Sequence, residues 1–246
     1  MVELAIIGGS GLRSLKNLAI ERRYVMHTPY GEPSGPLTYG QFYGKRVVFL
    51  ARHGTGHTIP PHKVNYCANL WALHEIGVEN VIAVAAVGGI SPELEPGRLA
   101  FPDQIIDYTW SRQHTFHDRD LSQVTHIEFT WPYCALLREK LIAAARSGNI
   151  AALEKGTYGA TQGPRLETAA EINRLERDGC DMVGMTGMPE TALARELGLC
   201  YATIAVTANF AAGRGTGEIS MQEIDQNLKR GMIQVRSLLE QLIPSL

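Results

Sequence analysis

Short runs of apolar and β-branched residues, several of them apolar throughout, constrain the fold of this chain most. They lie at 4–7, 46–51, 80–86, 105–107, 156–161, 182–185 and 202–207. A strand without a polar face suits a sheet that is covered on both sides. Segments with apolar residues at helical spacing alternate with these runs, at 64–76, 136–144, 172–175, 193–197 and 224–242. The alternation predicts a three-layer α/β fold with a central mixed β-sheet flanked by helices.

The chain shows no boundary at which it would divide into domains. Its 246 residues contain no internal repeat, no low-complexity tract and no linker rich in Pro, Gly and Ser. Hydrophobic residues make up 45% of the chain, enough for a sizeable core. We therefore expect one domain over residues 1–246. Its least regular stretch, residues 30–40, is rich in Gly and Pro and is predicted to be a surface connection.

Charge and cysteine usage indicate the environment of the protein. A formal net charge of -2 argues against a basic protein that binds nucleic acid through many phosphates. Cys67, Cys134, Cys180 and Cys200 lie far apart without a CxxC pair, so we expect reduced thiols. The N-terminus has no basic leader, and no stretch approaches the roughly 18 apolar residues of a membrane helix. These features predict a soluble, cytoplasmic protein that binds neither nucleic acid nor membranes.

A glycine-rich loop, Gly8-Gly9-Ser10-Gly11, follows the first apolar run. Such a loop can bind a phosphate, because glycines let the backbone approach closely while amides and the Ser10 hydroxyl donate hydrogen bonds. A plain tight turn is one alternative. A dinucleotide site is another, although the GxGxxG pattern is incomplete because Ser14 replaces its third glycine.

Arg52 and His53 end the second apolar run, where a guanidinium and an imidazole can both donate to an oxyanion. The alternatives are a surface ion pair for Arg52 and a histidine at the edge of the core for His53. His53, His57 and His62 also suggest a metal site, but their spacing matches no zinc motif and no acid or cysteine lies nearby in sequence. We expect no metal.

Glu167 and Asn209 are the polar residues best suited to binding a heterocycle. A carboxylate accepts from a ring N–H, and a carboxamide both donates and accepts, which matches the edge of a 6-oxopurine such as hypoxanthine. Taken alone, each residue fits an ordinary structural role better, Glu167 as an acid in the first turn of a helix and Asn209 as a turn residue. Other residues at the ends of these runs have ordinary core or loop interpretations: Leu166, Met185, Met221 and Ile224 as core residues, and His126 as a solvent-facing one.

Taken together, ordered motifs resemble the trimeric purine nucleoside phosphorylase and methylthioadenosine phosphorylase family. They are Ile6-Ile7-Gly8-Gly9-Ser10-Gly11-Leu12, Leu50-Ala51-Arg52-His53-Gly54, His57-Thr58-Ile59, Val64-Asn65-Tyr66, Gly163-Pro164-Arg165, and Met185-Thr186 with Pro189-Glu190. The likeness runs from residue 2 to about residue 242. It implies a phosphorylase-type fold, a homotrimer, and phosphorolysis of a purine nucleoside or thionucleoside with inorganic phosphate as co-substrate and no cofactor.

By position, the resemblance assigns a phosphate site, a ribose contact and a contact to the base. Met185 resembles the family residue whose side chain lies under the ribose, and Leu166 stands where the family has an aromatic residue against the base. Ala85 stands where the family usually has Thr or Ser, which removes one hydroxyl donor. The phosphate-binding groups implied are Ser10, Arg52, His53, Thr186 and the backbone around Ala85 and Ala86.

The base-reading loop separates the subclasses of this family. Adenine-specific members carry two aspartates, at the positions of Asn209 and Ala211 here, and this chain lacks both. An amide at Asn209 tolerates a 6-oxo group, whereas a carboxylate would face its lone pairs. Glu167 lies in the Gly-Pro-x-x-Glu-Thr run in which 6-oxopurine enzymes carry a base-binding glutamate. The resemblance therefore predicts hypoxanthine as the base, with Asn209 and His53 taking part in catalysis.

At the sugar end, Met221 aligns with the histidine that ordinary nucleoside phosphorylases place near the 5′-hydroxyl. With Ile224 one turn later, the pocket suits a methylthio group. His126 lies in a segment resembling the one that reaches into a neighbouring subunit's 5′ pocket. The predicted substrate is S-methyl-5′-thioinosine, within purine salvage from deaminated methylthioadenosine. Phosphorolysis of methylthioadenosine or of inosine and guanosine, a non-catalytic nucleoside-binding module, and a NAD-dependent oxidoreductase remain alternatives.

Overall fold

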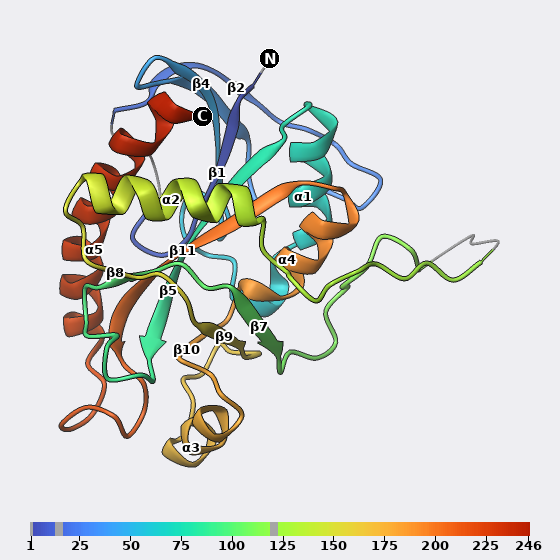
Figure 1. Cartoon of the computed structure of the whole chain (residues 1–246). Helices are drawn as coiled ribbons and strands as arrows, with labels where there is room; N and C mark the ends of the chain where they lie inside the picture. Colours follow the sequence, from blue (N-terminus) through green and yellow to red (C-terminus); the bar gives the residue numbers. More distant parts are fainter. Residues whose placement is uncertain (1, 13–16, 119–122) are drawn as a thin grey trace.

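A mixed β-sheet lies at the centre of the computed structural model, which describes residues 2–12, 17–118 and 123–246 (Figure 1). The strands are β1 (Leu4–Gly8), β2 (Ala19–Tyr24), β3 (Leu37–Phe42), β4 (Lys45–Ala51), β5 (Asn80–Gly89), β6 (Leu99–Ala100), β7 (Gln104–Asp107), β8 (Ala152–Leu153), β9 (Thr157–Ala160), β10 (Met182–Gly184) and β11 (Cys200–Phe210). The helices are α1 (Tyr66–Glu75), α2 (Ala135–Ser147), α3 (Ala169–Arg177), α4 (Gly187–Glu196) and α5 (Met221–Leu242).

Helices cover both faces of this sheet, as the apolar strands require. Leu4 and Ile6 of β1 pack in a cluster with α2 and α5, whereas Ala5 and Ile7 pack in a second cluster with α1 and α4. Figure 1 shows these helix pairs on different sides of β1 and β5. The three-layer α/β fold predicted from the sequence is confirmed. No helix in the described part of the chain combines the length and apolar character needed to cross a bilayer.

The long strand β5 changes its neighbour part-way along its length. Its first half, through Ala83, pairs parallel to β1, and its end at Gly88 and Gly89 pairs antiparallel to β10. β11 runs parallel to β5 along the other edge. Because β1 ends at Gly8 before β10 begins to pair, this edge of β5 has a gap between its two neighbours. The gap lies at the carboxyl ends of β1, β4 and β11, where ligands bind in open α/β sheets.

One expectation about the N-terminal part of the chain is wrong, and one alternative for the glycine loop lacks structural support. Residues 30–40 are not wholly a surface connection, since β3 begins at Leu37 and pairs with β4. No helix follows the glycine loop among the described residues, and the next element is β2. A dinucleotide-binding turn needs a helix that opens directly behind it. The loop therefore lacks that context, while Ser14 itself lies outside the described residues.

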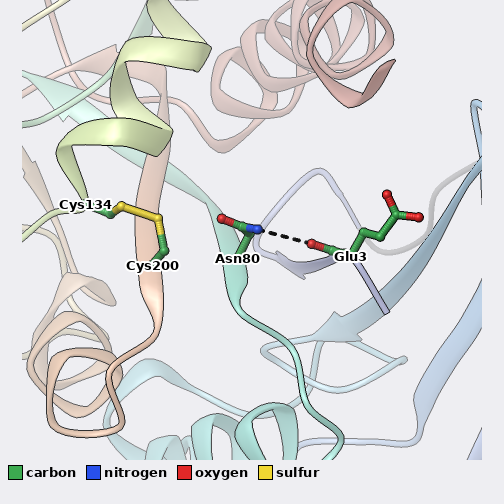
Figure 2. The surroundings of a disulfide bond; sticks show 4 residues. All are labelled: Glu3, Asn80, Cys134 and Cys200. Carbon is green, nitrogen blue, oxygen red and sulfur yellow. Dashed lines mark hydrogen bonds between the residues drawn. A yellow bond between two sulfur atoms is a disulfide. The ribbon is translucent and has the colours of Figure 1, made fainter. Parts of the chain in front are cut away.

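The expectation that all four cysteines are reduced is wrong for Cys134 and Cys200. Cys134 precedes α2 and Cys200 begins β11, and the two form a disulfide with a Cα–Cα distance of 5.1 Å (Figure 2). The Cys134 amide also donates to the Tyr201 carbonyl at 2.9 Å, which holds the two segments side by side. A separation of 66 residues hides this proximity from sequence reasoning. Cys67 and Cys180 are buried free thiols.

Candidate active site

A cavity of about 320 Å³ opens in the gap beside β5. Four neighbouring segments supply much of its wall: the loop after β1, the second half of β5, the end of β10 and the end of β11. Gly9 and Ser10 come from the first, Ala86 from the second, and Thr186 follows the third. Residues remote in sequence therefore meet where these strands end.

Asn209 enters the cavity wall because β11 contains a bulge. The pairing of β11 with β5 shifts between Thr207 and Asn209, so that Ala208 has no partner on β5. A bulge inserts an extra residue and redirects the side chains that follow it. Asn209 lines the cavity directly after this irregularity.

Arg52 lies in the cavity wall and is held by a buried acid. Its Nε and Nη2 donate to the two carboxylate oxygens of Glu190, each at 2.7 Å. Its Nη1 donates to the Val84 carbonyl at 2.9 Å. Burial alone would lower the pKa of Arg52, but the charge of Glu190 and its hydrogen bonds raise it above the ordinary value. Arg52 is therefore a permanent cation in a fixed orientation.

Gly9 lets the phosphate-side loop approach Arg52 closely. A Cβ at this position would lie 2.4 Å from the Val84 carbonyl oxygen and 2.8 Å from Nη1 of Arg52. The first of these atoms belongs to the backbone and cannot move aside. A glycine is needed here for steric reasons.

Two histidines and a serine meet in the same part of the cavity. Nδ1 of His53 lies 2.8 Å from the Ile59 carbonyl, which can only accept, so Nδ1 carries the proton and Nε2 of the neutral ring is an acceptor. Burial and the charge of Arg52 lower the pKa of His53 to about 4. The His57 ring lies 4.8 Å from that of His53, and its Nε2 is 3.3 Å from Ser10 Oγ. His53 is therefore uncharged at neutral pH.

Glu167 and Asn209 each present polar atoms to the cavity with part of their hydrogen bonding already used. The Thr161 hydroxyl donates to Oε1 of Glu167 at 2.6 Å. Nδ2 of Asn209 donates to the Phe210 carbonyl at 2.6 Å. Asn209 keeps its carbonyl oxygen and a second N–H for a ligand, and Glu167 keeps its second oxygen. Ala211 lines the same wall and is buried.

The rest of the lining is largely apolar and partly open. Met185 and Ile224 are half-buried, whereas Leu166 is 41% exposed and Met221, the first residue of α5, is 71% exposed. Large apolar side chains at a cavity rim suit an apolar ligand group or a covering partner. Among the described residues, no group of three or more His, Cys, Asp or Glu side chains could hold a metal ion.

Residues 3–244 match the sequence profile of the Phosphorylase superfamily. This chain belongs to that superfamily. It is 53% identical over 243 residues to a probable S-methyl-5′-thioinosine phosphorylase of Pseudomonas syringae pv. tomato, with 99% of each chain covered. It is 45% identical over 249 residues to a 6-oxopurine nucleoside phosphorylase of Pyrococcus furiosus, with 99% of this chain and 93% of the other covered.

The fold comparison agrees with the sequence comparison. Methylthioadenosine phosphorylase of Schistosoma mansoni, in complex with adenine, superposes with a TM-score of 0.94 at 32% identity, covering 100% of this chain and 92% of the other. The phosphorylase-type fold implied by the motifs is therefore present along the chain.

This phosphorylase-superfamily chain brings most of the sequence-predicted site residues to one cavity. They are Ser10, Arg52, His53, Ala86, Leu166, Glu167, Met185, Thr186, Asn209, Ala211, Met221 and Ile224. Ala85 is not among the lining residues, because the side chains of a strand alternate and that of Ala85 packs in a core cluster. His126 is exposed, together with residues 123–125, on the segment between β7 and α2.

Sequence reasoning missed three residues that organise this cavity. His57 and Glu190 lie in the motifs that resemble the family, but nothing in their spacing signals their contacts with Ser10 and Arg52. Arg112 was not singled out at all. It is buried, and its Nη1 and Nη2 donate to the carbonyls of Met185 and Gln162, both at 2.8 Å. These contacts join the two loops that carry Met185 and Glu167.

Proposed function

We propose that this chain catalyses phosphorolysis of S-methyl-5′-thioinosine to hypoxanthine and 5-methylthioribose 1-phosphate. One observation carries the proposal: a single cavity combines oxyanion donors, an amide and a carboxylate that suit a 6-oxopurine, and apolar residues that suit a thioether. The similarity to proteins named for S-methyl-5′-thioinosine and for 6-oxopurine nucleosides supports it. The chain is then a pentosyltransferase of purine salvage.

In this reaction the C1′–N9 bond breaks ahead of attack by a phosphate oxygen on C1′. The electron pair of that bond leaves with the purine, and the ribosyl centre acquires oxocarbenium character. Ser10, Arg52 and Thr186 hold the phosphate, whose negative charge stabilises this centre. Neutral His53 offers an Nε2 acceptor, which suits the one O–H of a hydrogen phosphate dianion. No side chain needs to form a covalent bond.

Glu167 and Asn209 select the base. N1 of hypoxanthine carries a hydrogen, which the free oxygen of Glu167 accepts, whereas N1 of adenine has a lone pair that a carboxylate repels. The free N–H of Asn209 donates to O6 or N7 and stabilises the negative charge of the departing purine. Ala211 adds no second acid. Together, Glu167, Asn209 and Ala211 favour a 6-oxopurine over a 6-aminopurine as the base.

We propose that the chain forms a homotrimer, in which a neighbouring subunit completes the pocket for the 5′ end of the sugar. Leu166 and Met221 are exposed at the cavity rim, and Met221 brings a thioether where a 5′-hydroxyl would need a polar partner. Residues 123–126, which include His126, are exposed on their own chain, which suits a contact with a neighbouring copy. In the proposed trimer this segment covers the 5′ pocket of the adjacent subunit.

Inorganic phosphate is the co-substrate, and the reaction needs no organic cofactor or metal. Residues from Gly9 to Leu228 line this cavity, which supports the proposal that residues 1–246 form one domain. The product is a charged sugar phosphate, which does not cross a bilayer unaided. The proposed compartment is the cytoplasm, in which such a product would be retained.

The proposal is tested by incubating the protein with methylthioinosine, methylthioadenosine and inosine, each with and without phosphate. Chromatography identifies the free base and the sugar product. We expect hypoxanthine and 5-methylthioribose 1-phosphate from methylthioinosine only when phosphate is present. The value of kcat/KM for methylthioinosine should exceed the other two by at least about tenfold, the lower end of the discrimination that differences in pocket contacts produce.

Each alternative has its own result in this assay. A higher kcat/KM for methylthioadenosine or inosine contradicts the proposed substrate. Base release without phosphate indicates a hydrolase. Binding of all three nucleosides without turnover indicates a non-catalytic binding module.

A further inference from the structure

The Arg52 guanidinium has two edges able to bind an anion, and one of them is already occupied. A guanidinium carries five N–H groups, of which Nε has one and Nη1 and Nη2 have two each. Three of them are used: Nε and Nη2 on Glu190, and Nη1 on the Val84 carbonyl. Among the described residues, the second N–H groups of Nη1 and Nη2 have no hydrogen bond. One N–H group of each of these two nitrogens is left for phosphate.

Glu190 is itself fixed in place. It is completely buried, and the Tyr201 hydroxyl donates to its Oε1 at 2.8 Å. The Thr203 hydroxyl lies 3.4 Å from that of Tyr201. A carboxylate with two donors from one guanidinium and a third from a phenol cannot rotate without breaking strong hydrogen bonds. The plane of the Arg52 guanidinium is therefore set by Glu190 and Tyr201.

The same contact balances the charge of the phosphate site. Arg52 is the only Lys or Arg that lines this cavity among the described residues, and Glu190 cancels its charge. His53 adds none, because the pKa of His53 is lowered to about 4. A phosphate dianion therefore binds to N–H and O–H donors whose cation is already paired. It keeps more of its negative charge for the ribosyl centre than beside an unpaired cation.

We propose that Glu190 is a positioning residue for phosphate, which fixes the direction of the two free N–H groups of Arg52 and limits phosphate affinity by balancing the charge of that arginine. The inference rests on the proposed function, since phosphate is the nucleophile of that reaction. The phosphate dianion then binds weakly in the ground state, which raises the KM for phosphate. Its charge is fully used in the transition state, which raises kcat. Tyr201 assists by holding the carboxylate.

Glu190→Gln tests the charge, because it keeps the size of the side chain and removes its negative charge. We expect a dissociation constant for phosphate about tenfold lower, since an unpaired buried guanidinium attracts the dianion strongly. The kcat for methylthioinosine should fall about tenfold. The dissociation constant is measured from the rise of Tm with phosphate concentration, which does not depend on turnover. This variant is purified in phosphate and then dialysed.

Glu154→Gln is the matched control, because Arg146 donates from Nε and Nη2 to Glu154 in the same way on the surface. We expect both phosphate affinity and kcat to stay at the wild-type values in this control. Tyr201→Phe is the second variant, because it loosens the carboxylate and leaves both charges in place. Its phosphate affinity should stay within about twofold of wild type while kcat falls.

Equal or weaker phosphate binding by Glu190→Gln would overturn the inference. An equal gain in phosphate affinity in Tyr201→Phe would also overturn it, because the loss of the Glu190 charge would then not explain the tighter binding. If the wild-type chain binds phosphate but releases no base, the proposed function fails. The phosphate affinities of the three variants still decide the role of Glu190 in that case.

Discussion

The Thr161 hydroxyl donates a 2.6 Å hydrogen bond to Oε1 of Glu167, and so orients the carboxylate that faces the cavity. Thr161 follows β9 and lies 3.3 Å from the Gly184 carbonyl, at the end of β10. Through Thr161, the Glu167 carboxylate is held by the ends of β9 and β10. Glu167 is placed before the substrate binds, which reduces the entropy cost of binding.

Thr161→Val should lower kcat/KM for methylthioinosine about tenfold, because a hydrogen bond to a charged group is lost. Thr161→Ser keeps the hydroxyl and should restore most of the activity. Steady-state kinetics with all three proteins measures the effect, and Tm separates it from loss of folding. Equal losses in the Ser and Val variants would show that the methyl group, not the hydroxyl, matters.

Asn209→Asp should move the preference from the 6-oxo toward the 6-amino purine. The new carboxylate accepts from the 6-amino group of adenine and repels the 6-oxo group of hypoxanthine. We expect the ratio of kcat/KM for methylthioinosine over methylthioadenosine to fall by about ten- to a hundredfold. Asn17→Asp makes the same chemical change at an exposed position and is the control. An unchanged ratio in the Asn209 variant would mean that this side chain does not contact the substituent at position 6 of the purine.

The strands that build the cavity could be predicted, because their apolar runs are local features of the sequence. Arg52 and Ser10 follow directly from where those runs end, and the runs place both residues at one edge of the sheet. β2 escaped prediction because all six of its residues are exposed and it pairs only with β3 at the sheet edge. Such a strand carries no apolar pattern to detect.

The contacts between distant residues could not be predicted from sequence spacing. Glu190 meets Arg52 across 138 residues, and Cys134 meets Cys200 across 66. The direction of Asn209 depends on a bulge, which has no marker such as a glycine at Ala208. Sheet pairing decides these features, and that pairing is settled only when the whole chain is folded.

The ionisation of His53 predicts a pH dependence of stability. In the folded chain the pKa of His53 is about 4, whereas in the unfolded chain a histidine titrates near 6.5. Between these values the unfolded state binds more protons, so the stabilisation from neutral His53 is complete above pH 6.5 and is lost as pH falls toward 4. Between pH 6.5 and 4, the free energy of unfolding should therefore fall by about 3 kcal/mol less in His53→Gln than in the wild type. Tm measured from pH 4 to 8 for both proteins gives the difference, and parallel curves would contradict the assignment.

Reduction of the Cys134–Cys200 disulfide should destabilise the fold without changing its architecture. The bond closes a loop across 66 residues and joins the start of α2 to the start of β11 (Figure 2). Closing a loop of this length removes entropy from the unfolded chain worth about 4 kcal/mol in the chain-entropy description, and measured values are typically about 2–4 kcal/mol. For a chain of this size that corresponds to a fall in Tm of roughly 5–15 °C.

Thermal unfolding with and without dithiothreitol measures this fall. The double variant Cys134→Ser, Cys200→Ser is the control, since its lower Tm should no longer respond to the reductant. Cys67 and Cys180 are buried thiols in either case, so alkylation of the unfolded chain should label two cysteines before reduction and four after it. Four labelled cysteines before reduction, with a Tm that ignores dithiothreitol, would mean that the two sulfurs meet without forming a bond.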